Sequence, residues 1–194
     1  LDMMVAYHNW GGPRWSSYEQ TQEYEDGSID NIYQEQDMEM SSSSWEAKVD
    51  YTNHLTDWLK LEAGFDGRYS HEDSPVKTMQ GSSSEDMILN EDLYNQFIYR
   101  NNVSALYATL GGKFKSFSFS AGLRSESWQV RARSLGYGQT IEDEDVKEYK
   151  HNDFALFPSA FVSWSLPKNN ELQVNFTRRI RRPWGGQLNS FKNI

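Results

Sequence analysis

A few side chains of this chain are of types that could carry out chemistry, and their spacing decides whether they do. The four histidines are isolated in the sequence and show no spacing typical of metal ligands. They are His8, His54, His71 and His151. Neither Ser83 nor Ser127 lies in the G-x-S-x-G context that activates a nucleophilic serine. The sequence therefore predicts no catalytic residue and no enzymatic activity.

Three clusters of acidic residues are the remaining candidates for a metal site. They are Asp37 with Glu39, Glu85 with Asp86, and Glu142 to Asp145. None has the glycine-containing twelve-residue spacing of a calcium loop. Cysteine is absent, so neither a disulfide nor a thiolate site can form. We expect solvated acids, no metal site and no cofactor.

The densest basic run is Thr177 to Pro183, which reads TRRIRRP. Such a run can mark a nucleic-acid site, but here it continues a strand-like pattern. The overall charge is -9, and segments 18–42, 70–92 and 134–153 hold 20 of the 28 acidic residues. A nucleic-acid-binding chain usually has a dominant basic face, so we expect no nucleic-acid partner.

A long hairpin at residues 154–177 must position that basic run. From Phe154 to Leu166 every even position is apolar, and Pro167 to Asn170 has turn chemistry. Alternation then resumes with Leu172, Val174 and Phe176 on one face. The first strand is longer than the roughly 5–6 residues usual in soluble proteins and suits a tilted crossing of a bilayer.

The rest of the chain predicts five more strands, giving about seven in all. We expect a strand over residues 1–10 that ends at Gly11-Gly12-Pro13, and clear strands over 45–51 and 59–69. A strand over 93–111 ends in a turn at Gly111-Gly112-Lys113; both of its phases carry apolar residues, so its outward face stays open. A further strand begins at Phe117. Long polar loops are predicted at 14–42, 70–92 and 134–153, alternating with short turns.

This alternation of short turns and long loops predicts an all-β, antiparallel, up-and-down transmembrane barrel. Its short turns would be periplasmic and its long loops extracellular. The mean hydropathy of -0.80 agrees with this, because only alternate strand residues face lipid. Seven strands do not close a single-chain bacterial barrel, which has an even number. We therefore expect residues 1–194 to be part of one barrel domain, without its remaining strands or a plug.

The predicted strand direction assigns faces to the basic run. Continued alternation places Arg178 and Arg182 outward near the outer membrane edge, where guanidinium groups suit lipopolysaccharide phosphates. It places Arg179 and Arg181 on the inner face, as candidate ligand contacts. An ordinary charged rim is the alternative for all four arginines.

Aromatic residues of the first loop are further candidates for ligand contacts, because exposed rings stack on sugars and hydrophobic ligands. These residues are Trp10, Trp15, Tyr18, Tyr24 and Tyr33. Packing within the loop is the alternative reading of the same rings.

The run from Glu171 to Pro183, followed by Gln187-Leu188-Asn189, resembles a signature hairpin of TonB-dependent outer-membrane receptors and the related outer-membrane β-barrel family. Phe157 to Ala160 and Ala121 to Glu126 are similar to the same pattern. The resemblance covers residues 93–191 well and residues 1–92 in architecture only.

The resemblance implies a 22-stranded barrel with a plug, which imports a scarce nutrient such as a siderophore, glycan or peptide. It implies as partners the outer-membrane lipid, the TonB complex through a plug absent here, a surface lipoprotein and a small-molecule or oligomeric ligand. The location implied is the outer membrane of a Gram-negative bacterium. Two other functions stay open: a plugless porin or adhesion barrel, and a soluble secreted β-sandwich that binds carbohydrate. A membrane-embedded barrel enzyme lacks any supporting residues.

Overall fold

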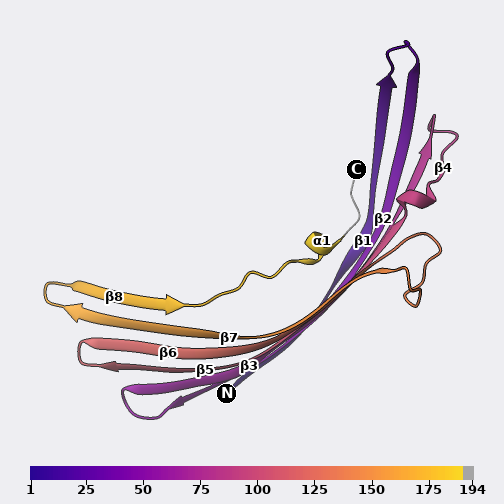
Figure 1. Ribbon diagram of the computed structural model, residues 1–194. Helices are drawn as coiled ribbons and strands as arrows, with labels where there is room; N and C mark the ends of the chain where they lie inside the picture. Colours follow the sequence, from indigo (N-terminus) through magenta and orange to yellow (C-terminus); the bar gives the residue numbers. More distant parts are fainter. Residues whose placement is uncertain (190–194) are drawn as a thin grey trace.

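The computed structural model describes residues 1–189, which form one curved antiparallel sheet (Figure 1). Its strands follow one another in the order β1-β2-β3-β5-β6-β7-β8, with the short β4 beside β3. The strands are β1 (Asp2–Glu23), β2 (Ile29–His54), β3 (Leu59–Gly81), β4 (Ile88–Leu89), β5 (Asn95–Phe114), β6 (Phe117–Leu135), β7 (Lys147–Leu166) and β8 (Asn170–Thr177). The predicted all-β, up-and-down topology is confirmed, with β1 and β8 at the two edges of the described sheet.

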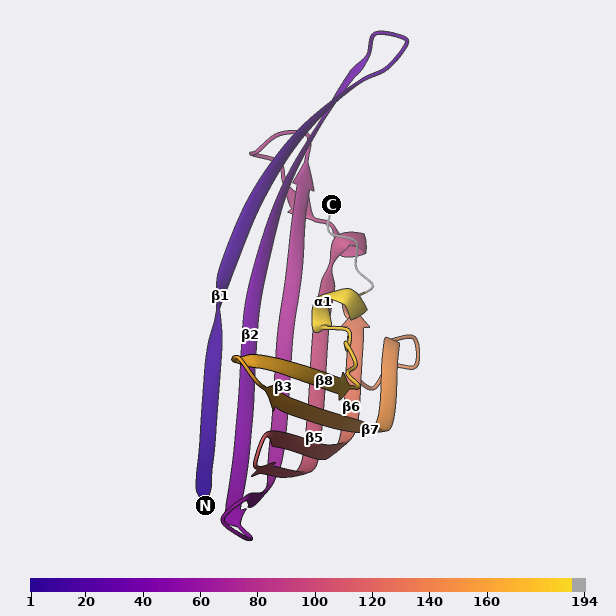
Figure 2. The same cartoon turned by 90° about the vertical axis from the view of Figure 1, so that its left-hand side faces the viewer.

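Helix is nearly absent. A 3-10 turn, η1 (Glu91–Leu93), precedes β5, and a four-residue helix, α1 (Gly185–Leu188), follows β8. Within residues 1–189, no helix has both the length and the apolar character needed to cross a membrane. The short turns lie at one end of the sheet and the longer connections at the other, as Figure 2 shows.

Cross-strand register assigns every strand residue to the convex or the concave face. Leu172, Val174 and Phe176 pair with the even positions of β7 and lie on the convex face, with 55, 65 and 60% of their surface exposed. The apolar phase of β7, from Phe154 to Trp164, lies on the same face. The outward phase predicted for this hairpin is therefore confirmed.

The same register settles the facing of β5. Leu106, Ala108 and Leu110 pair with convex residues of β3 and β6, whereas Ala105 and Tyr107 face the concave side. On β3 the convex phase runs from Leu59 to Tyr69. The short-turn half of the convex face is thus a continuous apolar band.

The first predicted loop is wrong. β1 continues through Gly11-Gly12-Pro13 to Glu23 and pairs with β2 throughout, so the connection spans only residues 24–28. Within the described sheet β1 pairs with β2 alone, and this sheet accommodates Pro13, which has no N–H to donate. Hydrophobic alternation did not reveal this hairpin because both of its faces are polar.

The other two long loops are also shorter than predicted. β3 extends to Gly81, with β4 paired to Met79 and Gln80, and β7 begins at Lys147 instead of Phe154. The connection between β6 and β7 is therefore 136–146. In both places polar residues continue the backbone ladder after the apolar pattern has ended.

The turn predicted at Gly111-Gly112-Lys113 is wrong by a few residues. These residues lie in β5, and the turn is Lys115-Ser116, with Lys115 at a φ of 53°. Gly112 is required for packing: a Cβ there would lie 2.9 Å from the Trp58 backbone oxygen. The turn predicted over 167–170 is confirmed at 167–169, whereas the turn predicted over 52–57 lies at 55–58 because β2 continues to His54.

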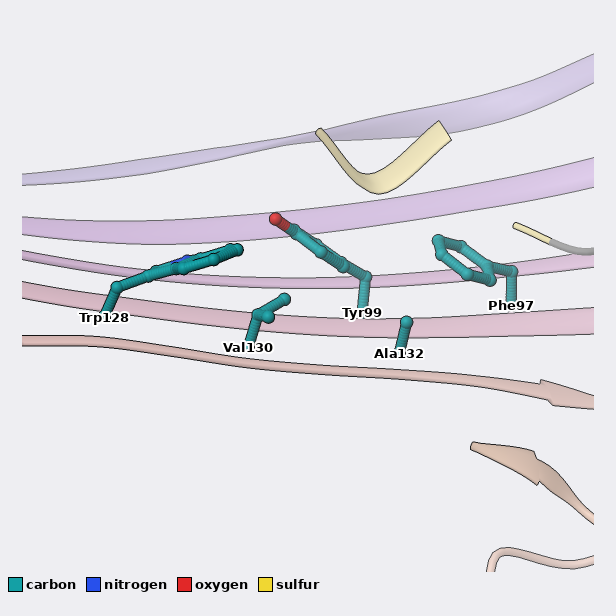
Figure 3. Packing of buried hydrophobic residues seen from close by; sticks show 5 residues of the cluster. All are labelled: Phe97, Tyr99, Trp128, Val130 and Ala132. Carbon is teal, nitrogen blue, oxygen red and sulfur yellow. The ribbon is translucent and has the colours of Figure 1, made fainter. Parts of the chain in front are cut away.

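The concave face carries a small apolar cluster toward the long-connection end. It consists of Phe97 and Tyr99 on β5 with Trp128, Val130 and Ala132 on β6, and Figure 3 shows these side chains on one side of the sheet. Leu188 of α1 packs against the cluster, and a Cβ at Gly185 would lie 3.3 Å from the Tyr99 ring. The segment after β8 is thereby held over the concave face.

Candidate functional site on the concave face

Charged residues of opposite sign recur two positions apart on the concave phase of neighbouring strands. Because alternate residues share a face, each such pair projects to the same side of the sheet. We call the connected set the ionic ladder. It consists of Glu46, Lys48 and Asp50 on β2, Asp66 and Arg68 on β3, Tyr107 on β5, Arg124 and Glu126 on β6, and Arg182 after β8.

The ion pairs connect β2, β3 and β6, and the Tyr107 hydrogen bond to Asp50 adds β5. Arg124 is central: its Nη2 lies 3.1 Å from Asp66 Oδ2, and its Nε donates to Glu126 Oε1 at 2.5 Å. Arg68 lies 3.2 Å from Asp66 and 3.4 Å from Glu46. Asp66 and Glu126 are buried, and the ion pairs compensate the cost of removing their carboxylates from water.

Gly64 makes room for one link of the ladder. In the register, Asp50, Gly64, Tyr107 and Arg124 are successive cross-strand neighbours. The Tyr107 ring crosses β3 over Gly64, where a Cβ would lie 2.5 Å from the ring, and its hydroxyl donates to Asp50. The Arg124 guanidinium lies 5.7 Å from the centroid of the same ring. A glycine is therefore needed at position 64 for contact between β2 and β5.

Arg182 closes the ladder at its far end and departs from its predicted place. β8 ends at Thr177, so the strand alternation does not extend through the basic run. The Arg182 guanidinium turns to the concave face, 2.5 Å from Glu126 and 5.3 Å from the centroid of the Trp128 ring. The outward position expected for Arg182 is therefore wrong, because the buried Glu126 and the aromatic ring attract this cation inward.

The other arginines of the basic run stay exposed. The backbone N–H of Arg178 donates a hydrogen bond to the Pro158 carbonyl oxygen. Arg178 and Arg179 line a depression that Arg124 and Glu126 also line. Arg181 is exposed next to Arg182 in the same irregular segment. The segment is thus irregular, and its arginines do not alternate between two faces as they would in a strand.

The predicted aromatic ligand contacts separate into different places. Trp10 and Tyr18 lie on the concave phase of β1, whereas Trp15 and Tyr33 lie on the convex phase. The Tyr33 hydroxyl donates to Glu19 at 2.8 Å, and Tyr24 lies in the turn at the tip. The structure thus brings Trp10 and Tyr18 to the side of the ladder, well beyond its end, and leaves the other three apart.

The acidic cluster around Asp86 has a structural role within its loop. The Asp86 carboxylate accepts from the Ser82 hydroxyl and from the Ser83 hydroxyl and N–H, each at 2.7 Å. These hydrogen bonds, the Ser82 hydroxyl first, lower the pKa of Asp86 to about 2. Within residues 1–189, no three His, Asp or Glu side chains are grouped closely enough to hold a metal ion.

The ladder residues were not singled out from the sequence, although a signal existed. Glu46/Lys48/Asp50, Asp66/Arg68 and Arg124/Glu126 each alternate in sign on the phase opposite to apolar residues. That pattern indicates paired charges on one wet face. What the sequence does not contain is the register that joins the pairs across strands.

A convex apolar band, a charged concave face and one up-and-down sheet agree with the comparison of the whole chain with known families. Residues 1–194 match the model of the outer membrane protein beta-barrel family. The chain belongs to the outer membrane protein beta-barrel family. A search of curated proteins found no match to it.

Membership gives the sheet its orientation and its location in the outer membrane of a Gram-negative bacterium. In a barrel of this type the convex band faces lipid and the concave face lines the lumen. The short turns are periplasmic and the long connections extracellular. The side chains of the ionic ladder consequently face the lumen, and α1 lies on the lumenal side of the sheet.

Proposed function

We propose that this chain forms part of the wall of a TonB-dependent outer-membrane receptor that imports a scarce nutrient, of the siderophore, glycan or peptide class. The observation that carries the proposal is the ionic ladder, which covers the lumenal face of four strands. A lumenal plug needs polar partners on the barrel wall. Charged groups give complementary contacts with a plug, and because water screens them, the plug can also dissociate from the wall.

The segment after β8 supports the same function. Arg182 ties residues 178–189 to the ladder through Glu126, and Gly185 and Leu188 tie them to the lumenal apolar cluster. Residues 178–189 of the chain thus occupy space on the lumenal side of the wall. In an open channel, that space would be filled with water. This arrangement favours a gated barrel over a passive pore.

Ligand capture falls to the extracellular end. The β1–β2 hairpin extends beyond the other strands in Figure 1, and Trp10 and Tyr18 present exposed rings to its lumenal side. Such rings stack on sugars and other ligands with apolar faces. We assign the protein a transport role without catalysis, with the TonB complex acting through a plug.

Uptake measurements in three strains test the proposal. The strains are the wild type, one lacking this protein and one lacking TonB, each offered labelled ferric siderophores, oligosaccharides and short peptides. We expect one ligand class to lose uptake in both deletion strains alike. Uptake that needs this protein but continues without TonB would show a passive porin-type barrel and contradict the proposal.

A further inference from the structure

A basic row lies on the lipid-facing side of the sheet, just beyond the apolar band. His71 on β3, Arg100 on β5, Arg131 on β6 and Lys150 on β7 are successive cross-strand partners. Register places all four on the convex phase, together with Leu106 and Phe154 farther down the strands. This row lies on the opposite face from the ionic ladder.

The row borders a shallow hollow of about 400 Å³ on the convex face. Arg100, Arg131 and Lys150 line it, and the amides of Asn102, Gln129 and Asn152 form the next row toward the membrane. Tyr69 lies at its edge, and no carboxylate lines it. The hollow therefore combines three cations with three hydrogen-bonding amides.

The cations of the row are only partly compensated. Glu148 lies 3.2 Å from the Arg131 guanidinium and 2.9 Å from that of Arg133. Arg100 and Lys150 are exposed and take part in no ion pair within residues 1–189. Like charges directly opposite one another destabilise a sheet, so adjacent cations on three strands favour binding of an anion.

The height of the row selects the anion. Lys150 lies four residues beyond Phe154, and Arg100 lies six residues beyond Leu106. At about 2.3 Å of height per residue in a tilted strand, Lys150 lies roughly 9 Å past Phe154 and Arg100 roughly 14 Å past Leu106. That is the level of lipid head groups on the extracellular side, and the side chains point away from the barrel.

We propose that this hollow binds the phosphate groups of the outer-leaflet glycolipid, lipopolysaccharide. Guanidinium groups match phosphate oxygens in geometry, the lysine adds a third charge, and the amides suit sugar hydroxyls. The site involves Arg100, Arg131 and Lys150, and not Arg182, which pairs with Glu126 in the lumen. The inference rests on membership of the barrel family and is independent of nutrient import.

The test uses the protein purified from outer membranes in mild detergent. The variant carries Arg100→Gln, Arg131→Gln and Lys150→Gln together. A matched control removes three cations elsewhere, through Lys77→Gln, Lys115→Gln and Lys168→Gln. The probes are diphosphorylated lipid A, dephosphorylated lipid A and inorganic phosphate, with binding measured by native mass spectrometry and titration. Gel migration before and after boiling checks that each variant is folded.

We expect the triple variant to bind diphosphorylated lipid A at least about tenfold more weakly, while the control binds as the wild type does. Dephosphorylated lipid should bind the wild type weakly, and millimolar phosphate should not displace lipid A. Equal binding by variant and control, or equal binding of both lipids, overturns the proposal. Displacement by inorganic phosphate also overturns it, in favour of a free-anion site. If the triple variant does not fold, Arg100→Gln and Lys150→Gln singly are expected to give a smaller loss of the same kind.

Discussion

At the scale of single residues, Arg124 is the side chain on which the lumenal wall most depends. It bridges the buried carboxylates of Asp66 and Glu126, and its guanidinium also lies over Tyr107. Arg68 also contacts Asp66, but its side chain is 61% exposed. The two arginines can therefore be compared directly, because both bind Asp66 but water screens the charge of Arg68 much more than that of Arg124.

Replacing Arg124 by Gln should destabilise the folded barrel by about 1–3 kcal/mol, because two buried carboxylates lose a charged partner. Arg68→Gln should cost less than about 1 kcal/mol. Urea unfolding of the protein in lipid bilayers measures both values. A larger loss for Arg68→Gln would show that the ladder does not depend on burial.

Asp86 gives a pH prediction for the extracellular loop. The serine hydrogen bonds lower its pKa to about 2 from the ordinary 3.8, so they stabilise the ionised form. The hydrogen bonds therefore stabilise the folded loop at pH values above the ordinary pKa of 3.8, and this stabilisation is lost as the pH falls through the folded-state pKa. The carboxyl resonance of Asp86, assigned with an Asp86→Asn variant, should titrate near 2. Titration near 3.8 would show that the loop does not hold this hydrogen-bond arrangement.

At the scale of elements, the alternation of faces along each strand carries the membrane assignment. Val174 faces the convex side of β8, and its neighbour Asn175 faces the lumen. Val174→Arg places a charge in lipid and should cost about 2–4 kcal/mol, whereas lumenal Asn175→Arg should cost much less. The fraction of protein that resists unfolding in cold detergent measures the difference. Equal effects at the two positions would show that β8 has no lipid-facing side.

The β5–β6 turn gives a second prediction at this scale. Lys115 has a φ of 53°, a conformation that glycine adopts without strain, while Gly112 lies against the Trp58 backbone. Lys115→Gly should be neutral or stabilising by up to about 1 kcal/mol, and Gly112→Val should be destabilising by more than that. Thermal unfolding in detergent gives both signs. Tolerance of valine at position 112 would show that β5 does not approach the Trp58 backbone as closely as described.

Elements within the membrane were predictable, and those beyond it were not. The apolar phases of β7 and β8 and the turns at 55–58 and 167–169 follow from a strict contrast between lipid and water on the two faces. Beyond the apolar band both faces are polar, so the extensions of β1, β2 and β3 leave no alternating pattern. Arg182 was misplaced for another reason: its partner Glu126 is 56 residues away in the sequence, and only the register brings the two together.

At the scale of the whole molecule, the two faces of one sheet serve two environments. The convex face meets lipid along the apolar band and carries the basic row above it. The concave face carries the ionic ladder at mid-height and an apolar cluster that holds α1 toward the extracellular end. The apolar side of the sheet is thus convex near the short turns and concave toward the long connections. In a soluble sandwich, the face that packs on the core is apolar along the whole strand.

The most direct test of the account is the period of lipid exposure along β5. The chain has no cysteine, so single cysteines introduced from position 103 to 110 can each carry one spin label. We predict that collisions with oxygen, which concentrates in lipid, peak at 106, 108 and 110. Collisions with a water-soluble nickel complex should be lowest at the same three positions. Oxygen maxima at 105, 107 and 109, or no alternation along the strand, would contradict the assignment of the convex face to lipid.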